Sequence, residues 1–466
     1  MADATATTDH AKPANSRGRV IFASLIGTSI EFYDFYIYAT AAVLVFPRLF
    51  FPAENEAAQL LASLATFGVA FVARPIGSIL FGHFGDRIGR KTTLVASLLT
   101  MGIATVLIGC LPTALTPGWE ILAPALLALM RFCQGLGLGG EWSGAALLAT
   151  ENAPAGKRAI YGTFPQLGAP IGFILANTVF IVINATLPPE QFDAFGWRIP
   201  FLLSAILVIV GLYVRLKLIE TPAFTKVVER NEVVKVPLGS VFRHNWVQVL
   251  QGTIIMFATY VLFYLMTTFT LTFGTTPSSV EAGAAAAEAA GRPFDPEAFV
   301  PGLGYLRNDF LWMLIVGVVF FGIFTLVAGP LAERFGRKWM LTGVTAAIIV
   351  FGLLWVPLFG AGFGGVMFTL ILGFTLMGLT FGPMASFLPE LFPANVRYTG
   401  SAVAYNLSSV IGAAPAPFAA VALWGAADGS PLLVGLYLAG AGVVTLIVLL
   451  LSKDTRDRDY VGTTSA

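Results

Sequence analysis

Long runs of apolar residues follow one another along the chain and are separated by shorter polar stretches. A helix needs about 20 mostly apolar residues to cross the hydrocarbon core of a bilayer, so runs of this length predict membrane-spanning helices. We predict twelve of them. The first six cover roughly residues 20–46, 57–82, 92–112, 120–150, 159–186 and 198–218. The second six cover roughly residues 246–275, 308–332, 339–360, 363–388, 399–424 and 430–451.

The polar stretches set the expected domain boundaries. The domains are a disordered cytoplasmic N-terminal tail (1–18), an N-terminal six-helix bundle (19–218), a cytoplasmic linker (219–245), a C-terminal six-helix bundle (246–452) and a cytoplasmic C-terminal tail (453–466). The first apolar run is too long, and too polar at its centre, for a cleaved signal peptide. We therefore expect it to remain in the protein.

The composition excludes a water-soluble globular protein. Of the 466 residues, 56% are hydrophobic and only 11% are charged, whereas soluble domains carry about 25% charged residues. The formal net charge of +1 gives no argument for a nucleic-acid partner. Cys110 and Cys133 both lie in apolar runs and are interpreted as small buried residues. The three histidines lie in polar segments, so we expect no cofactor and no metal site.

The basic residues predict an orientation. If the N-terminus is cytoplasmic, 21 of the 27 Lys and Arg residues fall in loops or tails on that side. The opposite side has four, which are Arg48, Arg198, Arg292 and Arg307. The positive-inside rule therefore places both termini in the cytoplasm. On the exterior side the loop at about 276–307 is rich in Ala and Gly and predicts a short helix or a mobile segment, to which we assign no role.

The chain contains an internal repeat. The segment Gly82–Lys91 (GHFGDRIGRK) follows the second predicted span, and Gly329–Lys338 (GPLAERFGRK) follows the eighth with the same internal spacing. A second motif, Glu-x-x-Pro-x-x-x-Arg, begins at Glu151 after the fourth span and at Glu390 after the tenth. Repeats at corresponding places indicate two related halves with a substrate site between them at mid-membrane. The predicted fold is an all-α integral membrane protein with twelve transmembrane helices in two pseudo-symmetric six-helix bundles.

Five charged residues lie inside predicted spans, all in the N-terminal half: Glu31, Asp34, Arg74, Arg131 and Glu141. Intramembrane charges are costly, so each is a functional candidate. Glu31 and Asp34 are three residues apart and share a helix face. Two carboxylates this close in a low dielectric are not expected to stay ionised together, which makes one of them a candidate proton carrier. The five charges sum to −1, and one added proton would neutralise them beside a substrate carboxylate.

The remaining charges each have two interpretations. Arg74 is the leading candidate for binding a substrate carboxylate, because guanidinium and carboxylate pair through two parallel hydrogen bonds. Alternatively, Arg74 neutralises Glu31 or Glu141 as a structural pair. Arg131 is a candidate for substrate contact or for pairing with Asp34. Glu141 is a candidate for completing a proton path, within a run of glycines that is typical of close helix approach.

The C-terminal half has no charge deep in a predicted span. Tyr260 and Tyr264 lie four residues apart on one helix face, and Tyr405 and Asn406 lie on the eleventh span. We expect these residues, with Gln166 on the fifth span, to supply stacking and hydrogen bonds to the substrate. Aromatic core packing is the alternative role for the tyrosines.

The two repeated loops resemble the loop signature of the major facilitator superfamily. Four further segments resemble its metabolite:proton symporter branch: Gly27–Phe35, Ala73–Gly77, Arg131–Trp142 and Gly196–Phe201. That branch includes carriers for shikimate, proline/betaine, α-ketoglutarate and citrate, and the shikimate-type carriers look nearest. Glu31 stands where the shikimate carrier has Asp. The resemblance implies gating roles for the loop residues, which are Asp86, Arg90, Glu333, Arg337, Glu151, Arg158, Glu390 and Arg397.

Together these features predict a transporter and not an enzyme. We expect proton-coupled symport of a small organic anion (a mono- or dicarboxylate, shikimate-like or a keto acid) by alternating access, with a monomer as the working unit in a bacterial inner membrane. Sodium could use the same carboxylates. An alternative is a proton-coupled carrier of a zwitterionic osmolyte such as betaine or proline. A membrane sensor or enzyme is the remote alternative, because the chain lacks His/Cys clusters and a Gly-x-x-x-x-Gly-Lys-Ser/Thr loop.

Overall fold

A computed structural model describes residues 17–52, 56–218, 225, 228, 237–289, 294–297 and 299–455. Within this part of the chain every regular element is a helix. The predicted N-terminal tail falls almost entirely outside the described residues, as do much of the linker and the end of the C-terminal tail.

The N-terminal half consists of long helices joined by short connections. The long helices are α1 (Arg17–Leu44), α3 (Glu56–Arg87), α4 (Arg90–Cys110), α5 (Leu122–Glu151), α6 (Arg158–Gln166) continuing as α7 (Gly168–Thr186), and α9 (Ile199–Leu216). The short helices are α2 (Phe46–Phe50), α8 (Pro189–Ala194) and η1 (Gly196–Arg198). Pro165 near the end of α6 lacks a backbone N–H, which accounts for the break between α6 and α7.

The C-terminal half repeats this arrangement and begins after α11 (Pro237–His244) from the linker. Two of its spans contain a π-helical turn: α12 (Trp246–Tyr264) continues through η2 (Leu265–Phe269) into α13 (Thr270–Thr275), and α19 (Arg397–Ser408) continues through η3 (Ser409–Ala413) to α20 (Ala416–Ala426). The other spans are α15 (Arg307–Phe335), α16 (Arg337–Leu353) followed by α17 (Trp355–Gly360), α18 (Gly362–Glu390) and α21 (Leu432–Leu451). The loop between α13 and α15 contains α14 (Val280–Ala289).

Every predicted span corresponds to a helix or to helices in succession. Ten helical segments of the described chain are long and apolar enough to cross a membrane by length and composition alone. The other two predicted spans are α3, and α16 with α17. Helix α3 carries charges at Arg74, Asp86 and Arg87, and α16 has only 17 residues because the helix is interrupted at Leu354.

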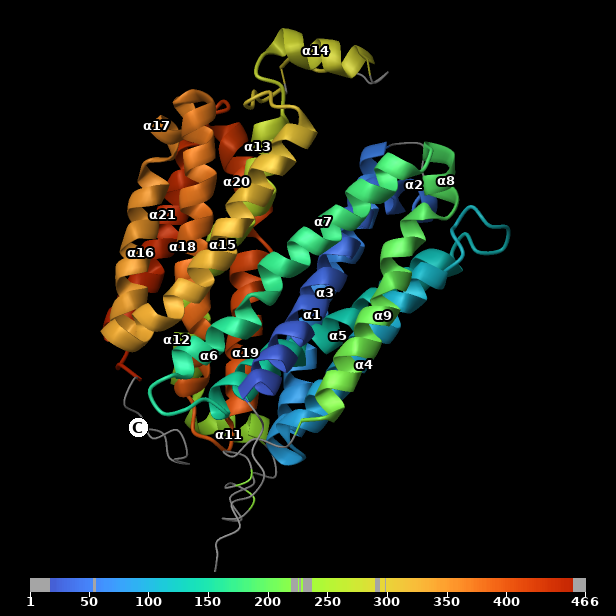
Figure 1. The fold of residues 1–466 in the computed structure, drawn as a ribbon. Helices are drawn as coiled ribbons and strands as arrows, with labels where there is room; N and C mark the ends of the chain where they lie inside the picture. The colour runs from blue at the N-terminus through green and yellow to red at the C-terminus, as the bar shows by residue number, and fades with distance from the viewer. Residues whose placement is uncertain are drawn as a thin grey trace, which may run out of the picture.

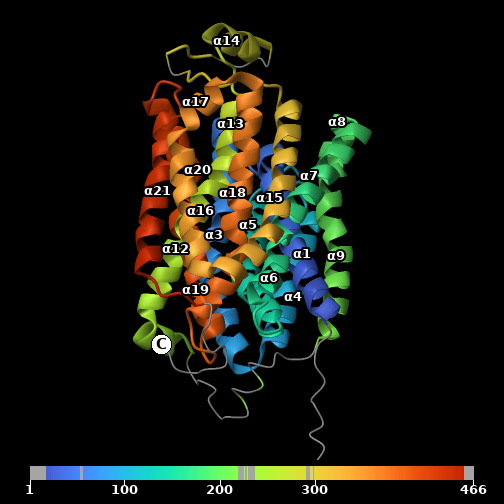
Figure 2. The same cartoon turned by 60° about the vertical axis from the view of Figure 1, so that its left-hand side comes forward.

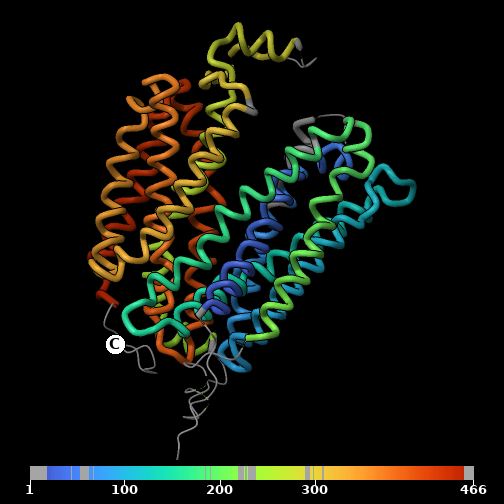
Figure 3. Tube along the Cα trace, viewed as in Figure 1, coloured from blue at the N-terminus to red at the C-terminus, as the bar shows by residue number. Residues whose placement is uncertain are grey.

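The two halves form separate bundles that meet at one end of the molecule (Figure 1). They come together near the C-terminal label and diverge toward the end that carries α8 and α14, as the trace in Figure 3 also shows. The turned view of Figure 2 places α14 beyond the ends of the long helices. At the end where the bundles meet, α3 packs against α19, and α6 packs against α15 and α18. The central space between the halves is therefore bounded at this end.

The repeated loops share one backbone feature. Gly89 has φ 111° and Gly336 has φ 87°, and each directly precedes the helix that follows its loop. Side chains rarely adopt positive φ, so glycine is the residue that turns the chain at both places. The sequence repeat is thus also a structural repeat.

Candidate functional site

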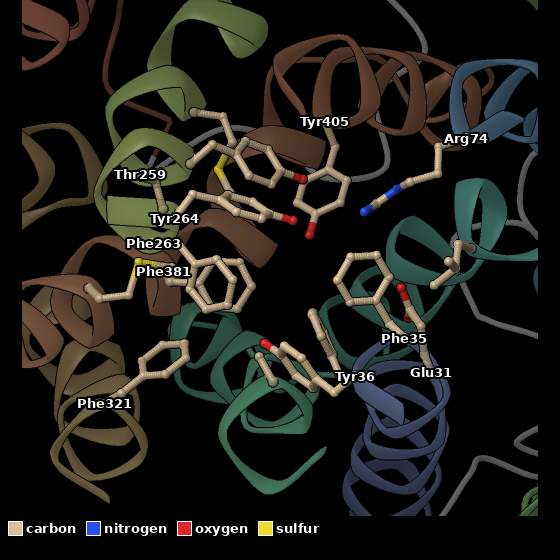
Figure 4. A pocket seen from close by; sticks show the side chains of 16 residues that line it. Glu31, Phe35, Tyr36, Arg74, Thr259, Phe263, Tyr264, Phe321, Phe381 and Tyr405 are labelled. Carbon is tan, nitrogen blue, oxygen red and sulfur yellow. The ribbon is translucent and has the colours of Figure 1, made fainter. Parts of the chain in front are cut away.

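A cavity lies between the two halves (Figure 4), with about 510 Å³ of empty space, part of which is open to solvent. Its 16 lining residues come from α1, α3, α5 and α7 of the N-terminal half and from α12, α15, α18 and α19 of the C-terminal half. Helices from both repeats therefore enclose one space, in the position that the sequence predicted for a substrate site.

Glu31 and Arg74 are the charged residues of the cavity lining. Glu31 is 1% exposed, and its Oε2 has no hydrogen-bond partner among the described residues. The Arg74 Nε donates to Asn406 Oδ1 at 3.1 Å, and its guanidinium carbon lies 5.7 Å from the centre of the Tyr405 ring. No Asp or Glu in the described part of the chain forms an ion pair with Arg74. A carboxylate and a guanidinium, which carry opposite charges when ionised, thus face the same space.

Tyrosines form the wall around this charged end. Tyr260 and Tyr264 from α12 and Tyr405 from α19 all line the cavity, as does Tyr36, which the sequence analysis missed. In Figure 4 the hydroxyls of Tyr264 and Tyr405 point into the space that Arg74 faces. The Tyr405 ring is stacked on the Trp142 ring, with centroids 3.9 Å apart and planes 3° apart. This stacking fixes the Tyr405 ring from behind.

The rest of the lining is largely apolar and was missed by sequence analysis. It comprises Phe32, Phe35, Leu138, Ala169, Met256, Thr259, Phe263, Phe321, Met377 and Phe381. With 39 phenylalanines in the chain, no sequence signal separates the few that reach the cavity from those that pack in the core or face lipid.

Asp34 and Arg131 lie outside this cavity lining and belong to a separate buried network. Asp34 accepts hydrogen bonds from Thr105 Oγ1 at 2.8 Å and from Ser204 Oγ at 2.7 Å. Thr105 Oγ1 accepts from Gln134 Nε2 at 2.8 Å, and Gln134 Oε1 accepts from Arg131 Nη1 at 3.1 Å. Arg131 is therefore linked to Asp34 through two neutral side chains.

Two predictions about these residues need correction. Arg131 does not line the substrate cavity in the described structure; its guanidinium lies 4.0 Å from the centre of the Tyr38 ring. Glu31 and Asp34 do not face a common space. Residues three apart on a helix differ by about 60° in direction. On a helix surrounded by neighbours, this angle turns Glu31 toward the cavity and Asp34 toward α4 and α9.

Glu141 has a partner that the sequence analysis did not single out. Arg215, near the end of α9, forms a buried ion pair with Glu141 and is 2% exposed. Ser97 Oγ donates to Glu141 Oε2 at 2.9 Å, and Arg215 Nη1 donates to the Leu94 carbonyl at 2.5 Å. The proposed Arg74–Glu141 pair is therefore replaced by Arg215–Glu141. A signal existed, because Arg215 lies within the predicted span and not beyond it.

Arg215 changes the charge balance of the N-terminal half. Apart from the gate residues at the closed end, the buried charged groups described in this half are now three carboxylates (Glu31, Asp34, Glu141) and three arginines (Arg74, Arg131, Arg215), so their formal sum is zero and not −1.

Gln166 and Asn406 support the cavity from behind. Gln166 accepts from Trp142 Nε1 at 2.8 Å and donates to the Phe381 carbonyl at 2.7 Å, so it connects the halves and does not line the cavity. Asn406 donates to the Gly139 carbonyl at 3.0 Å and accepts from Arg74. Both amides were expected to contact the substrate directly. In the structure they instead position the residues that line the cavity.

The repeated loops connect the halves at the closed end. Asp86, near the end of α3, accepts hydrogen bonds from the backbone N–H groups of Tyr398 (3.2 Å) and Thr399 (2.9 Å) in the first turn of α19. Arg90 donates to Asp86 at 2.9 Å and to the Ala394 carbonyl at 3.2 Å. A carboxylate at a helix N-terminus satisfies free N–H groups and interacts favourably with the helix dipole.

The second loop makes the equivalent contact from the C-terminal half to the N-terminal half. Glu333 Oε1, near the end of α15, accepts from the Ala159 N–H in the first turn of α6 at 2.6 Å. Arg337 donates to Glu333 at 2.9 Å. Each acidic residue of the repeat therefore caps a helix of the other half.

The acidic residues of the second motif have partners beyond that motif. The Glu151 carboxylate lies 3.7 Å from Arg397 of the other half and 3.6 Å from Arg90. The Glu390 carboxylate lies 3.5 Å from Arg337 and accepts a hydrogen bond from Thr455. The packing of the halves brings Glu151 to Arg397, the basic residue of the other copy of the motif, while Arg158 begins α6.

Comparison with known proteins agrees with this architecture. Residues 20–236 and 302–453 match the family described as "Sugar (and other) transporter". The chain is 55% identical to the inner membrane metabolite transport protein YhjE of Escherichia coli, covering 97% of this chain and 99% of that one. It is 34% identical to the shikimate transporter of the same bacterium (94% and 95% covered) and 30% identical to its proline/betaine transporter (96% and 86% covered).

A solved structure confirms the fold. The proton:xylose symporter XylE, a major facilitator protein, superposes with a TM-score of 0.74 at 16% identity over 96% of this chain and 98% of that one. The prediction of two six-helix bundles is thereby confirmed, and the relatives are transporters and not enzymes. The chain is a multi-pass membrane protein of the major facilitator superfamily and belongs to its family of sugar and other metabolite transporters.

Proposed function

We propose that this protein couples proton movement to the symport of a small organic anion by alternating access. The observation that carries the proposal is the placement of Glu31 and Arg74 on one cavity between the halves. A buried carboxylate with an unpartnered oxygen is able to accept a proton, and a buried guanidinium without an ion-pair partner attracts an anion.

The pairing of the other buried charges supports this assignment. Glu141 and Arg215 neutralise each other directly, and Asp34 and Arg131 do so through Thr105 and Gln134. Glu31 and Arg74 are the remaining carboxylate and the remaining guanidinium of this set, and no ion pair joins them in the described structure. Protonation of Glu31 leaves the charge of Arg74 uncompensated, so the proton and the anion favour each other's binding. The charged groups that face Glu31 are Arg74, Glu141 and Arg215.

The gate residues support alternating access. The caps from Asp86 to α19 and from Glu333 to α6 join the halves at one end, together with the Glu151–Arg397 contact. Breaking these contacts would let that end open to deliver substrate. We infer that this end is cytoplasmic, because it carries Arg87, Lys91, Arg334 and Lys338 of the repeated loops. The inner membrane is the expected location, since YhjE is an inner membrane protein.

The test uses purified protein in liposomes that contain a pH-sensitive dye. Shikimate, α-ketoglutarate, citrate, acetate, lactate and betaine are added outside, one at a time, at pH 6 and at pH 8. We expect saturable acidification of the lumen with an organic acid and its loss in Glu31→Gln. Arg74→Gln should remove saturable uptake of the acid. Protein-free liposomes correct for acids that cross the bilayer unaided.

Glu281→Gln is the matched control, because Glu281 lies on the exposed exterior helix α14. This variant should transport as the parent does. Undiminished proton movement in Glu31→Gln would remove Glu31 as the proton carrier. Uptake driven by a sodium gradient, with no change in luminal pH, would replace proton coupling by sodium coupling.

A zwitterionic osmolyte is the second candidate, and the same pair of residues favours it. Glu31 and Arg74 offer opposite charges to the two ends of betaine or proline, and a proline/betaine transporter is 30% identical to this chain. If betaine were the only compound to acidify the lumen in the dye assay, transport of a zwitterionic osmolyte would become the leading proposal.

A further inference from the structure

We infer that the cavity selects a monocarboxylate whose body is an apolar ring, and that it disfavours dicarboxylates and polyhydroxylated acids. The inference deepens the proposed function and rests on it. Three observations carry it: the number of uncompensated charges, the composition of the cavity end opposite Arg74, and the fixed aromatic surface between the two ends.

The charge balance limits the substrate to one negative charge. Away from the gate, Arg215 is compensated by Glu141 and Arg131 by Asp34, so protonated Glu31 leaves a single positive charge, on Arg74. A second carboxylate would lie in the cavity without a cation, and an unpaired buried charge is strongly unfavourable. One proton and one monoanion thus return the buried groups to a net charge of zero.

The cavity end away from Arg74 is built mainly from phenylalanine side chains. Phe263, Phe321 and Phe381 lie together on this side in Figure 4, across the cavity from Arg74 and Glu31. Phe321 lies 5.9 Å from Phe381 and 6.4 Å from Phe263 between ring centroids, so the three rings form one cluster. These three rings offer no hydrogen bonds to hydroxyl groups, and the Thr259 hydroxyl beside them is engaged with Thr380 at 2.9 Å. Tyr36 points its hydroxyl toward this end in Figure 4, so a polyhydroxylated body here would still leave most of its hydroxyls unsatisfied.

The surface between the ends suits a flat or cyclic body. Tyr405 is held by its stack on Trp142, and Tyr260 lies 5.4 Å from Tyr405 between ring centroids. The buried Tyr260 hydroxyl has no hydrogen-bond partner among the described residues. A carboxylate at Arg74 can accept this hydrogen bond while its ring packs on the aromatic wall.

The test compares acids that share one carbon ring. Binding of cyclohexanecarboxylate, quinate (its tetrahydroxy analogue), trans-cyclohexane-1,4-dicarboxylate and acetate to the purified full-length protein is measured by titration calorimetry at pH 6. We expect cyclohexanecarboxylate to bind at least tenfold more tightly than each of the other three. Binding should be lost in Arg74→Gln.

Two phenylalanines of α12 provide a matched pair of variants. Phe263 lines the cavity, whereas Phe257 is a half-buried residue of the same helix that does not belong to this lining. Phe263→Ala should weaken cyclohexanecarboxylate binding about tenfold and leave that of acetate unchanged, while Phe257→Ala changes neither. An equal loss in both variants would indicate a general defect of folding and would contradict a specific apolar end.

The outcomes separate this inference from the proposed function. Tightest binding of quinate would overturn the apolar body, and tightest binding of the dicarboxylate would overturn the single charge. No binding of any ring acid, with proton-coupled uptake of another acid in the dye assay, would overturn the inference alone. Binding of cyclohexanecarboxylate without any proton movement in that assay would leave the inferred site chemistry standing and overturn proton coupling.

Discussion

At the scale of single residues, the position of one arginine changes the electrostatics of the whole N-terminal half. Arg215 lies near the end of an apolar run, where a basic residue is usually a topological signal. In the fold its guanidinium is buried against Glu141 and the Leu94 carbonyl, and Ser97 donates a hydrogen bond to the same carboxylate. The Glu141 carboxylate is thereby neutralised, so Arg74 is left to face the cavity.

This pairing predicts an asymmetric response to mutation. Arg215→Met leaves Glu141 buried without its cation and is expected to reduce the free energy of unfolding by about 3–5 kcal/mol. Adding Glu141→Gln removes the uncompensated charge and should recover part of the loss. Thermal unfolding of the detergent-purified variants measures both effects. A double variant less stable than Arg215→Met alone would show that the pair does not explain the burial.

At the scale of helices, glycines determine how closely α3 and α5 approach. A Cβ atom added at Gly139 would lie 2.1 Å from the Arg74 carbonyl oxygen, and one added at Gly77 would lie 2.0 Å from the Leu136 carbonyl oxygen. The glycine-rich run of α5 was predicted to serve close helix approach, and these distances confirm it. The close packing also sets the position of Arg74 relative to the cavity.

Gly139→Ala is therefore expected to push α3 away from α5, because the obstructing atoms belong to the backbone and cannot rotate aside. Overpacking of this kind costs about 1–3 kcal/mol of unfolding free energy. Displacement of Arg74 should also weaken binding of a carboxylate in the calorimetric assay. Gly68→Ala is the control, since an added Cβ at Gly68 on the same helix α3 meets no atom within 4 Å. Equal behaviour of the two variants would contradict the role of close packing.

At the scale of the whole molecule, the two repeated loops act as reciprocal caps. Asp86 of the N-terminal half caps α19, and Glu333 of the C-terminal half caps α6. A carboxylate at a helix N-terminus contributes about 0.3–1 kcal/mol, which is small enough to be overcome in each transport cycle. The caps thus favour the conformation closed at this end without locking it.

Asp86→Asn removes the charge of one cap and should raise the population open at this end about two- to fivefold. A cysteine at Thr399, which is buried against Gly82 of α3, reports the opening. In a background without Cys110 and Cys133, its reaction with an impermeant thiol reagent should accelerate by that factor in inverted membrane vesicles. Asp309→Asn on α15, an exposed acidic residue at the other end, should have no effect. Faster reaction in right-side-out vesicles instead would reverse the proposed orientation.

The sequence by itself determined the spans, the duplication and the membrane class. In the hydrocarbon of a bilayer, backbone N–H and C=O groups find no water and must form hydrogen bonds within their own segment. Apolar runs of this length therefore form helices whatever their neighbours are. The repeated loops indicated two related halves, and intramembrane charge singled out five candidates, which are Glu31, Asp34, Arg74, Arg131 and Glu141. These features depend on residue type and spacing along the chain, which the sequence states directly.

Only the tertiary structure decided which charges face the cavity and which compensate one another. Glu31 and Asp34 are less than one helical turn apart in sequence. Asp34 nevertheless contacts α4 and α9, whereas Glu31 faces the cavity. The phenylalanines of the apolar end could not be identified from the sequence either. Positions that face lipid, the protein core or the cavity all favour phenylalanine, so the residue type does not tell them apart. The partner of a buried charge is set by how helices cross, and that depends on packing among segments far apart in the chain.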